Sequence, residues 1–201
     1  MIQTVISDLG GVIVFFDNQI FYEKMANFSP FAQEEIGKLA FSESGLRESF
    51  DKGEITSQEF YTRAVEKLKA NIDYDKFFSL YNDVFSLNPP VLEIMKRLKD
   101  KYRLILLSNT DVMRFGFVKQ EFPEVMIFDE YVLSFEVGFM KPHPQIYREA
   151  LKKAGTKAEE CVFIDDRAEN IQAAEELALQ GILFEENENL ESLLQGINLS
   201  F

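Results

Sequence analysis

Cysteine is almost absent from the sequence: Cys161 is the single example, so no disulfide can form within the chain. Disulfides belong mainly to oxidising compartments, and a cytoplasmic location is the simplest expectation. Cys161 lies in an apolar run, which predicts an inert core residue. Tryptophan is absent, whereas phenylalanine occurs 20 times, which indicates an ordinary aromatic core.

Long apolar runs are also lacking. Charged residues make up 27% of the chain, and the longest candidate run, Arg103–Ser108, is far shorter than the ~20 residues that span a bilayer. At the N-terminus, no basic segment precedes the first apolar run, and Asp8 interrupts it, unlike a signal peptide. We therefore expect no membrane partner.

Positive charge is scarce: 21 Lys and Arg stand against 34 Asp and Glu, a net charge of −13. Nucleic-acid binding depends on neutralising phosphates with Lys and Arg, so such a partner is disfavoured. A small anionic ligand needs only a local positive site and stays compatible with this charge. The length of 201 residues suffices for one sizeable core with a small accessory domain.

Short apolar runs alternate with amphipathic segments through most of the chain. The segments Pro90–Lys101, Pro144–Ala154 and Ala168–Leu179 have helical patterns, and Gly155 is placed to end the second. Strands that alternate with helices predict a Rossmann-like α/β fold, with a doubly wound parallel sheet. The predicted strands are Thr4–Ser7, Leu104–Leu107, Tyr131–Ser134, Cys161–Ile164 and Gly181–Phe184.

The segment 18–87 differs because it contains no convincing strand pattern. We expect it to form a helical cap domain inserted into a core made of residues 1–17 and 88–201, with Asn88-Pro89-Pro90 as the return hinge. Gly53 should break one helix, and Thr56 should cap the next. The predicted helices are Gln19–Asn27, Phe31–Leu39, Ser42–Asp51, Ser57–Lys69 and Tyr74–Phe85.

Polar residues suited to one chemistry follow three of the predicted strands. Asp8 follows the first, Ser108-Asn109 the second, and Asp165-Asp166 the third, with Lys141-Pro142 shortly before it. Ligands of open α/β sheets bind at the carboxyl ends of the strands, where these residues converge. Each is weak alone, since such residues often form turns or caps. Together they supply acids for a metal, a hydroxyl and a lysine for phosphate oxygens, and a candidate nucleophile.

Over essentially its whole length the sequence resembles the haloacid dehalogenase (HAD) superfamily, in its phosphatase branch with a helical cap. Four motifs in order make this resemblance specific. They are Val5-Ile6-Ser7-Asp8-Leu9-Gly10-Gly11-Val12, Leu106-Leu107-Ser108-Asn109-Thr110, the segment Ser134–Pro144 with Gly138, Lys141 and Pro142, and Val162-Phe163-Ile164-Asp165-Asp166 followed by Asn170.

The resemblance implies a catalytic and metal-binding role for two of these motifs. Asp8 would attack phosphorus and form an aspartyl-phosphate, which water then hydrolyses. Mg²⁺ would be held by the Asp8 carboxylate, the Gly10 carbonyl oxygen and Asp165, while Asp166 would support the metal through water or hold Lys141.

The other two motifs would bind the phosphoryl group. Ser108 and the Asn109 backbone N–H would contact its oxygens, and Lys141 would neutralise charge between it and the nucleophile. The resemblance implies hydrolysis of a small phosphorylated metabolite, such as a sugar phosphate, by a monomer or homodimer.

One position departs from the family pattern. The usual phosphatase has a second Asp two residues after the nucleophile, which protonates the leaving group and activates water, whereas this chain has Gly10. General acid–base catalysis is typically worth ~10²–10⁴-fold. A cap residue or water could substitute, the substrate could have a good leaving group such as an anomeric phosphate, or the protein could be weak or inactive. We favour a slow but real phosphatase.

Three other functions remain open. A 2-haloacid dehalogenase would use the same nucleophile without metal, although uncompensated acids at Asp165-Asp166 would repel its substrate. A phosphate-binding protein without turnover is compatible with Gly10, and phosphonate cleavage would require a cap lysine that the sequence does not single out. His143 is interpreted as a loop residue beside the site rather than a base. Phe15-Phe16 either face the cleft below the cap or pack in the core, and core packing is the default interpretation.

Overall fold

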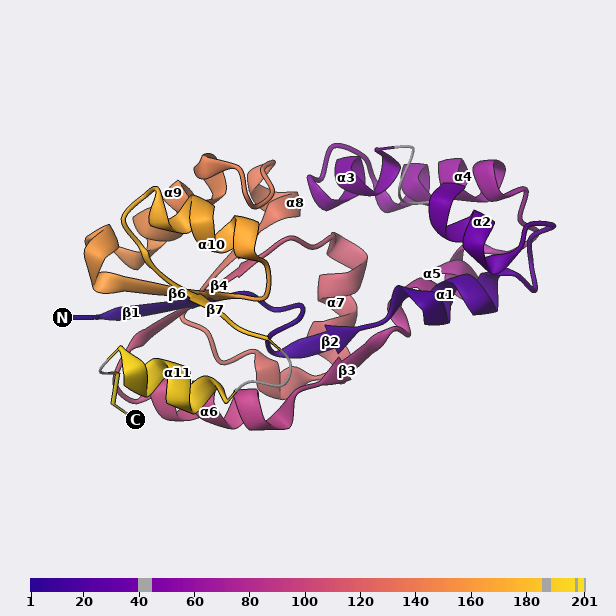
Figure 1. The fold of residues 1–201 in the computed structure, drawn as a ribbon. Helices are drawn as coiled ribbons and strands as arrows, with labels where there is room; N and C mark the ends of the chain where they lie inside the picture. The colour runs from indigo at the N-terminus through magenta and orange to yellow at the C-terminus, as the bar shows by residue number, and fades with distance from the viewer. Residues whose placement is uncertain (40–44, 186–188, 198, 201) are drawn as a thin grey trace.

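The computed structural model describes residues 1–39, 45–185, 189–197 and 199–200. Its centre is a parallel sheet of five strands in the order β5-β4-β1-β6-β7 (Figure 1). Both neighbours of β1 come later in the chain, so the sheet is wound in two directions from its middle. The predicted doubly wound α/β fold is confirmed. The strands are β1 (Thr4–Ser7), β4 (Arg103–Ser108), β5 (Glu130–Leu133), β6 (Cys161–Asp165) and β7 (Gln180–Leu183).

Helices cover both faces of this sheet. Successive side chains of a strand point to opposite faces, so Val5 joins one apolar cluster and Ile6 another. The first cluster contains residues of α6 (Pro89–Lys99), α7 (Val112–Glu121) and α11 (Leu190–Gly196). The second contains residues of α9 (Pro144–Ala154) and α10 (Ala168–Glu175), which lie above the sheet in Figure 1. This double cover explains why the central strands β1, β4 and β6 are buried almost along their whole length.

The chain between β1 and α6 forms a helical block with a core of its own. Its core includes Phe21, Phe60, Phe77 and Tyr81, packed ring against ring. Figure 1 shows this block beside the sheet rather than on either of its faces. The Thr56 hydroxyl caps α4 and Glu59 completes the capping box, as the sequence predicts. The helices are α1 (Asn18–Met25), α2 (Gln33–Gly37), α3 (Leu46–Asp51), α4 (Ser57–Leu68) and α5 (Tyr74–Asn82).

A short strand pair joins the two parts of the chain, and the sequence patterns did not predict it. β2 (Val14–Phe16) pairs antiparallel with β3 (Phe85–Leu87), so the prediction that segment 18–87 has no strand is wrong. The helix predicted to reach Phe85 ends at Asn82 instead, because the chain must extend to pair with β2. Asn88 secures the junction through its backbone N–H to the Ile13 carbonyl oxygen at 2.9 Å.

Other helix boundaries also differ from the predictions. The helix predicted to continue to Leu179 ends at Glu175, and Ala178 adopts a left-handed φ of 66° before β7. The helix predicted from Ser42 begins at Leu46, with Gly45 as its N-cap residue in a left-handed conformation, and positions 42–44 of that prediction lie outside the described residues. The helices α7 and α11 were not predicted. Within the described part of the chain, no helix is long and apolar enough to cross a membrane.

The end of α3 touches the core next to the short helix α8 (Ser134–Val137). The Ser134 hydroxyl donates to the Asp51 carbonyl oxygen at 2.6 Å. Gly53 approaches even more closely, because a Cβ added there would lie 2.2 Å from the Phe135 carbonyl oxygen. Gly53 also has a φ of 68°, which favours glycine. The helical block thus contacts the core at a second point, away from the β2–β3 pair.

Gly53→Ala should lower the free energy of unfolding by more than Gly45→Ala does. Both glycines have a left-handed φ, which costs an alanine about 1 kcal/mol, but an added Cβ at Gly45 meets nothing within 4 Å. The difference between the two variants in the free energy of unfolding, measured with urea, gives the cost of disturbing the close approach of Gly53 to Phe135. Equal losses would show that this contact contributes nothing.

Candidate active site

Two carboxylates are brought together by neighbouring strands at the middle of the sheet. Asp8 directly follows β1, and Asp165 is the last residue of β6, the strand paired with β1. The Asp8 backbone N–H donates to the Ile164 carbonyl oxygen at 2.9 Å, which continues the ladder and fixes the Asp8 backbone beside Asp165. Asp165 is fully buried and Asp8 is 8% exposed, so both lie in surroundings that disfavour uncompensated charge.

Lys141 supplies the compensating charge. Its Nζ lies 2.8 Å from Asp8 Oδ2 and 2.7 Å from Asp165 Oδ2, so one ammonium joins the two carboxylates. Asn109, at the end of β4, holds the backbone of Lys141 in both directions. Its Nδ2 donates to the Lys141 carbonyl oxygen at 2.9 Å, and its Oδ1 accepts from the Lys141 N–H at 2.7 Å. The Asn109 side chain therefore positions the lysine.

The same residues offer oxygen ligands for a divalent cation. Carboxylate oxygens of Asp8, Asp165 and Asp166 all lie within 4.8 Å of one another. Asn170 donates from Nδ2 to Asp165 Oδ1 at 2.8 Å, while its buried Oδ1 has no partner among the described residues. Gly11 makes room for Asp166, because an added Cβ would lie 2.1 Å from Asp166 Oδ2. Carboxylate and amide oxygens are the hard ligands that Mg²⁺ prefers, so this set, which includes Asn170 Oδ1, fits a magnesium ion.

Burial and mutual repulsion alter the ionisation of this group. Burial raises the pKa of Asp8 from 3.8 to about 7; Lys141 opposes this rise and Asp165 adds to it. The pKa of Asp166 is raised by burial and by Asp165. For Lys141, burial disfavours the charged form, but Asp8 and Asp165 outweigh it and raise the pKa. The lysine therefore stays charged. Without a second cation, its single positive charge has to offset the negative charge of more than one carboxylate.

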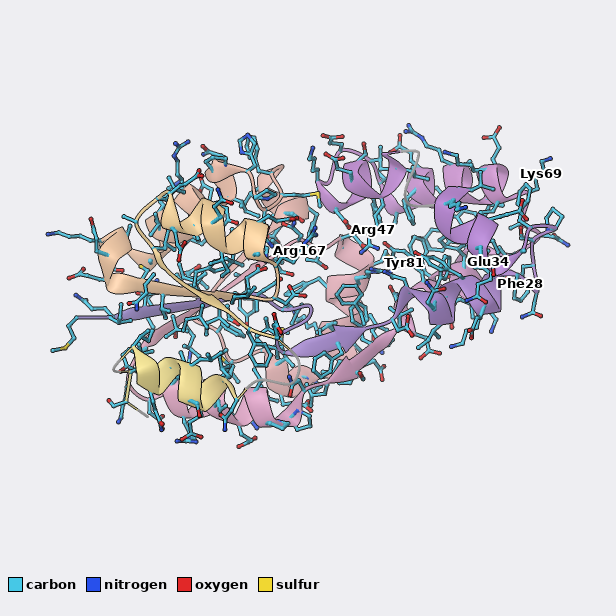
Figure 2. The ribbon with its side chains drawn as sticks, in the orientation of Figure 1. Phe28, Glu34, Arg47, Lys69, Tyr81 and Arg167 are labelled. Atoms are coloured by element: carbon cyan, nitrogen blue, oxygen red, sulfur yellow. The ribbon has the colours of Figure 1, made fainter. Side chains whose placement is uncertain are left out.

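Asp8 and Lys141 open onto a cavity of about 1060 Å³ between the core and the helical block. The core side includes Gly10, Phe16, Asn109, His143 and Asp166. The side formed by α3 and the turn after it is strongly polar, as its lining residues are Arg47, Glu48, Asp51, Lys52 and Glu54. Figure 2 shows Arg47 reaching down from α3 toward Tyr81, opposite Arg167 at the start of α10.

Most of the predicted site residues lie together in the structure, whereas Ser108 is almost completely buried. The structure brings Asp8, Asn109, Lys141, Asp165 and Asp166 together, and Gly10 lines the cavity. Ser108 is only 2% exposed, so its contact with a phosphoryl oxygen stays a prediction.

Two residues that were given structural interpretations also line the cavity. His143 caps α9, where its Nδ1 accepts from the Gln145 N–H at 3.2 Å. The interpretation of Phe16 as core packing is wrong, because its ring is 44% exposed at the cavity wall. Strand alternation does not explain this, because Val14 and Phe16 point to the same face of β2. Burial instead falls along the strand from Val14 to Phe16, where the chain leaves the core.

A largely buried charged cluster, part of which lines the cavity, was missed by the sequence analysis. Arg47 Nε lies 3.3 Å from Asp51 Oδ2, and Asp51 Oδ1 has no partner among the described residues. Burial raises the pKa of Asp51 to about 6, although Arg47 opposes the rise. Nearby, the Tyr81 hydroxyl donates to Asp111 Oδ2 at 2.8 Å, and the Arg114 guanidinium lies 4.2 Å from the Tyr81 ring centroid. The spacing of Arg47 and Asp51 by four residues was the one available signal.

Known proteins resemble this chain over nearly its whole length. A family model described as haloacid dehalogenase-like hydrolase matches residues 2–177. A solved HAD family enzyme of Bacteroides thetaiotaomicron, in complex with magnesium and inorganic phosphate, has a TM-score of 0.87 and 27% identity, covering 96% of this chain and 99% of that one.

Two curated relatives differ in how much of their length is matched. D-ribitol-5-phosphate phosphatase of Bacteroides thetaiotaomicron is 24% identical over 190 residues, 90% of each chain. Drimenol cyclase drtB of Aspergillus calidoustus is 24% identical over 202 residues, 98% of this chain, which spans only 37% of that relative.

Without metal, the protein should lose stability as the pH rises from about 4 to about 7. Because folding raises the pKa of Asp8 from 3.8 to about 7, this contribution is complete below 3.8 and is lost as the pH passes 7. Urea unfolding in EDTA across this range measures the loss, which Asp8→Asn should reduce. The exposed Asp83→Asn is the control, and an unchanged slope in Asp8→Asn would contradict the raised pKa of Asp8 in the folded protein.

Proposed function

Because the chain belongs to the haloacid dehalogenase-like hydrolase family, we propose that it hydrolyses a small phosphate monoester in a Mg²⁺-dependent reaction with Asp8 as nucleophile. The observation that carries this proposal is the position of Lys141 Nζ, 2.8 Å from Asp8 and 2.7 Å from Asp165, at the floor of a cavity of about 1060 Å³. The volume is sufficient for a small organic phosphate.

The reaction divides into two steps. In the first, a carboxylate oxygen of Asp8 attacks phosphorus, the bond to the leaving oxygen breaks, and an aspartyl-phosphate forms. In the second, water attacks that phosphorus and releases phosphate, which restores the Asp8 carboxylate. Lys141 lies where it neutralises charge between Asp8 and the phosphoryl oxygens in both steps, which matters because two anions otherwise repel each other.

A bound Mg²⁺ would add the charge that a single lysine cannot supply. Asp8, Asp165 and the Gly10 carbonyl oxygen would hold the ion, with Asp166 supporting it through water. Asn170 Oδ1, which has no partner among the described residues, would be available to the same shell. In the phosphoryl site, Asn109 would donate its backbone N–H, and Ser108 its hydroxyl.

The helical block would act as a cap that determines which leaving group fits. We treat residues 18–87 as this cap and residues 1–17 with 88–201 as the core. The cap side of the cavity is lined by charged residues of α3 and the turn after it, among them Arg47, Glu48 and Asp51. Such a wall suits a hydroxylated or charged leaving group and disfavours a hydrocarbon one. A sugar phosphate fits this chemistry.

Asp8→Asn should lower Mg²⁺-dependent phosphate release by roughly 10⁴-fold or more, as removal of a nucleophile does in other enzymes. The measurement is inorganic phosphate released from a panel of small phosphate esters, with and without EDTA. Asp83→Asn, an exposed carboxylate paired with Lys24 on the helical block, is the matched control and should retain activity.

Two outcomes would replace the proposal with one of its alternatives. Turnover of a 2-haloacid that persists in EDTA would indicate carbon–halogen hydrolysis. Tight binding of phosphate without release of phosphate from any ester would indicate a binding protein.

A further inference from the structure

Gly10 stands where the family's phosphatases carry their second acid, yet its backbone does not require glycine. Its φ lies outside the left-handed region that Gly11 and Gly53 occupy, so an L side chain can adopt this conformation. Glycine is therefore present for a reason other than backbone strain. The reason lies in what a side chain at this position would meet.

The ring of Phe16 fills the space into which that side chain would extend. A Cβ added to Gly10 would lie 3.0 Å from Phe16 Cε1 and 3.3 Å from Cδ1. The Phe16 ring is held from behind by Phe85, its partner in the β2–β3 pair, at a centroid separation of 6.3 Å. Because both Gly10 and Phe16 line the cavity that contains Asp8, the exposed part of the ring faces the reaction space.

We propose that Phe16 replaces the missing acid with an aromatic platform for the leaving group, which makes it a specificity-determining residue. This inference rests on the proposed function. An acid at position 10 would have to reach the leaving oxygen in order to protonate it. The Phe16 ring occupies the space of that side chain, so the ring lies against the leaving group. Phenylalanine offers a flat apolar face there and no proton.

The bond-breaking step then restricts the substrate. When Asp8 attacks phosphorus, the electron pair of the breaking P–O bond stays on the leaving oxygen, which departs as an anion and takes its proton from water. An oxygen of low basicity carries that charge readily, whereas an ordinary alkoxide needs a proton donor. The enzyme therefore acts on phosphate esters of weakly basic oxygens.

The platform also indicates the shape of the leaving group. A ring that presents a flat C–H or π face packs against phenylalanine, while its far side meets the charged cap wall that includes Arg47, Asp51 and Lys52. The class of substrate that satisfies both sides is a phosphate carried on a ring through a hemiacetal or phenolic oxygen, with polar substituents on the ring.

Asp51 is the competing explanation that the same cavity offers. It lines the cavity from the cap side, and its Oδ1 has no partner among the described residues. If Asp51 donated the missing proton, the leaving group would not need to be weakly basic. The two explanations therefore predict different dependence of rate on the leaving oxygen.

The experiment measures kcat/KM with Mg²⁺ for aryl phosphates of graded phenol acidity and for a simple alkyl phosphate. In the unaltered protein we expect kcat/KM to fall steeply as the leaving oxygen becomes more basic. Phe16→Ala should lower kcat/KM for ring-bearing substrates by about three- to tenfold, the loss of one aromatic contact. Combining it with Gly10→Asp should raise kcat/KM for the alkyl phosphate by about 10²-fold and flatten the dependence.

Phe139→Ala is the matched control, because Phe139 is a second exposed aromatic of the same cavity, stacked on His143 instead of over Gly10. It should shift all substrates alike and leave the slope unchanged. Since Phe16 is half exposed, its replacement should not prevent folding, which thermal melting of each variant verifies.

Two results would overturn the inference. A shallow dependence in the unaltered protein that becomes steep in Asp51→Asn would assign proton donation to Asp51 and leave the phosphatase proposal standing. Absence of Mg²⁺-dependent, Asp8-sensitive turnover on even the most activated aryl phosphate would overturn both proposals.

Discussion

The candidate active site depends on one ammonium group held between two buried carboxylates. Lys141 approaches Asp8 and Asp165 within 2.8 Å, and two ionised acids buried on adjacent strands need such a cation to offset their charge. The lysine is held in turn by Asn109, which grips its backbone in both directions. Four motifs that are distant in the sequence are therefore one electrostatic unit, in which removal of any member alters the charge balance of the rest.

Much of the core and of the reactive centre could be predicted from the sequence. Strands buried on both faces are continuously apolar, so β1, β4 and β6 are visible as short runs, and the polar residue ending each run falls at the same sheet edge. The convergence of Asp8, Asn109 and Asp165 follows from this geometry together with the family resemblance. Burial of Cys161 follows from the same apolar pattern.

The remainder depends on long-range pairing, which no local pattern records. The strand β3 was interpreted as the end of a helix, because Phe85 continues the aromatic spacing of α5 and only its pairing with Phe16 extends it. The same pairing brings the Phe16 ring over Gly10, so its role at the cavity was equally hidden. The buried position of Asp51 depends on α3 reaching Ser134, a contact between residues 83 positions apart.

The β2–β3 pair also has an evolutionary consequence. Residues directly opposite in an antiparallel pair lie about 5 Å apart, so the chain leaves the core at Phe16 and returns at Phe85 through almost the same point. Because the two ends of the segment between Phe16 and Phe85 lie side by side, the strand pair does not fix the length or topology of that segment. The parental α/β scaffold can therefore exchange this module for a larger, smaller or differently folded one while the sheet and its catalytic edge stay intact.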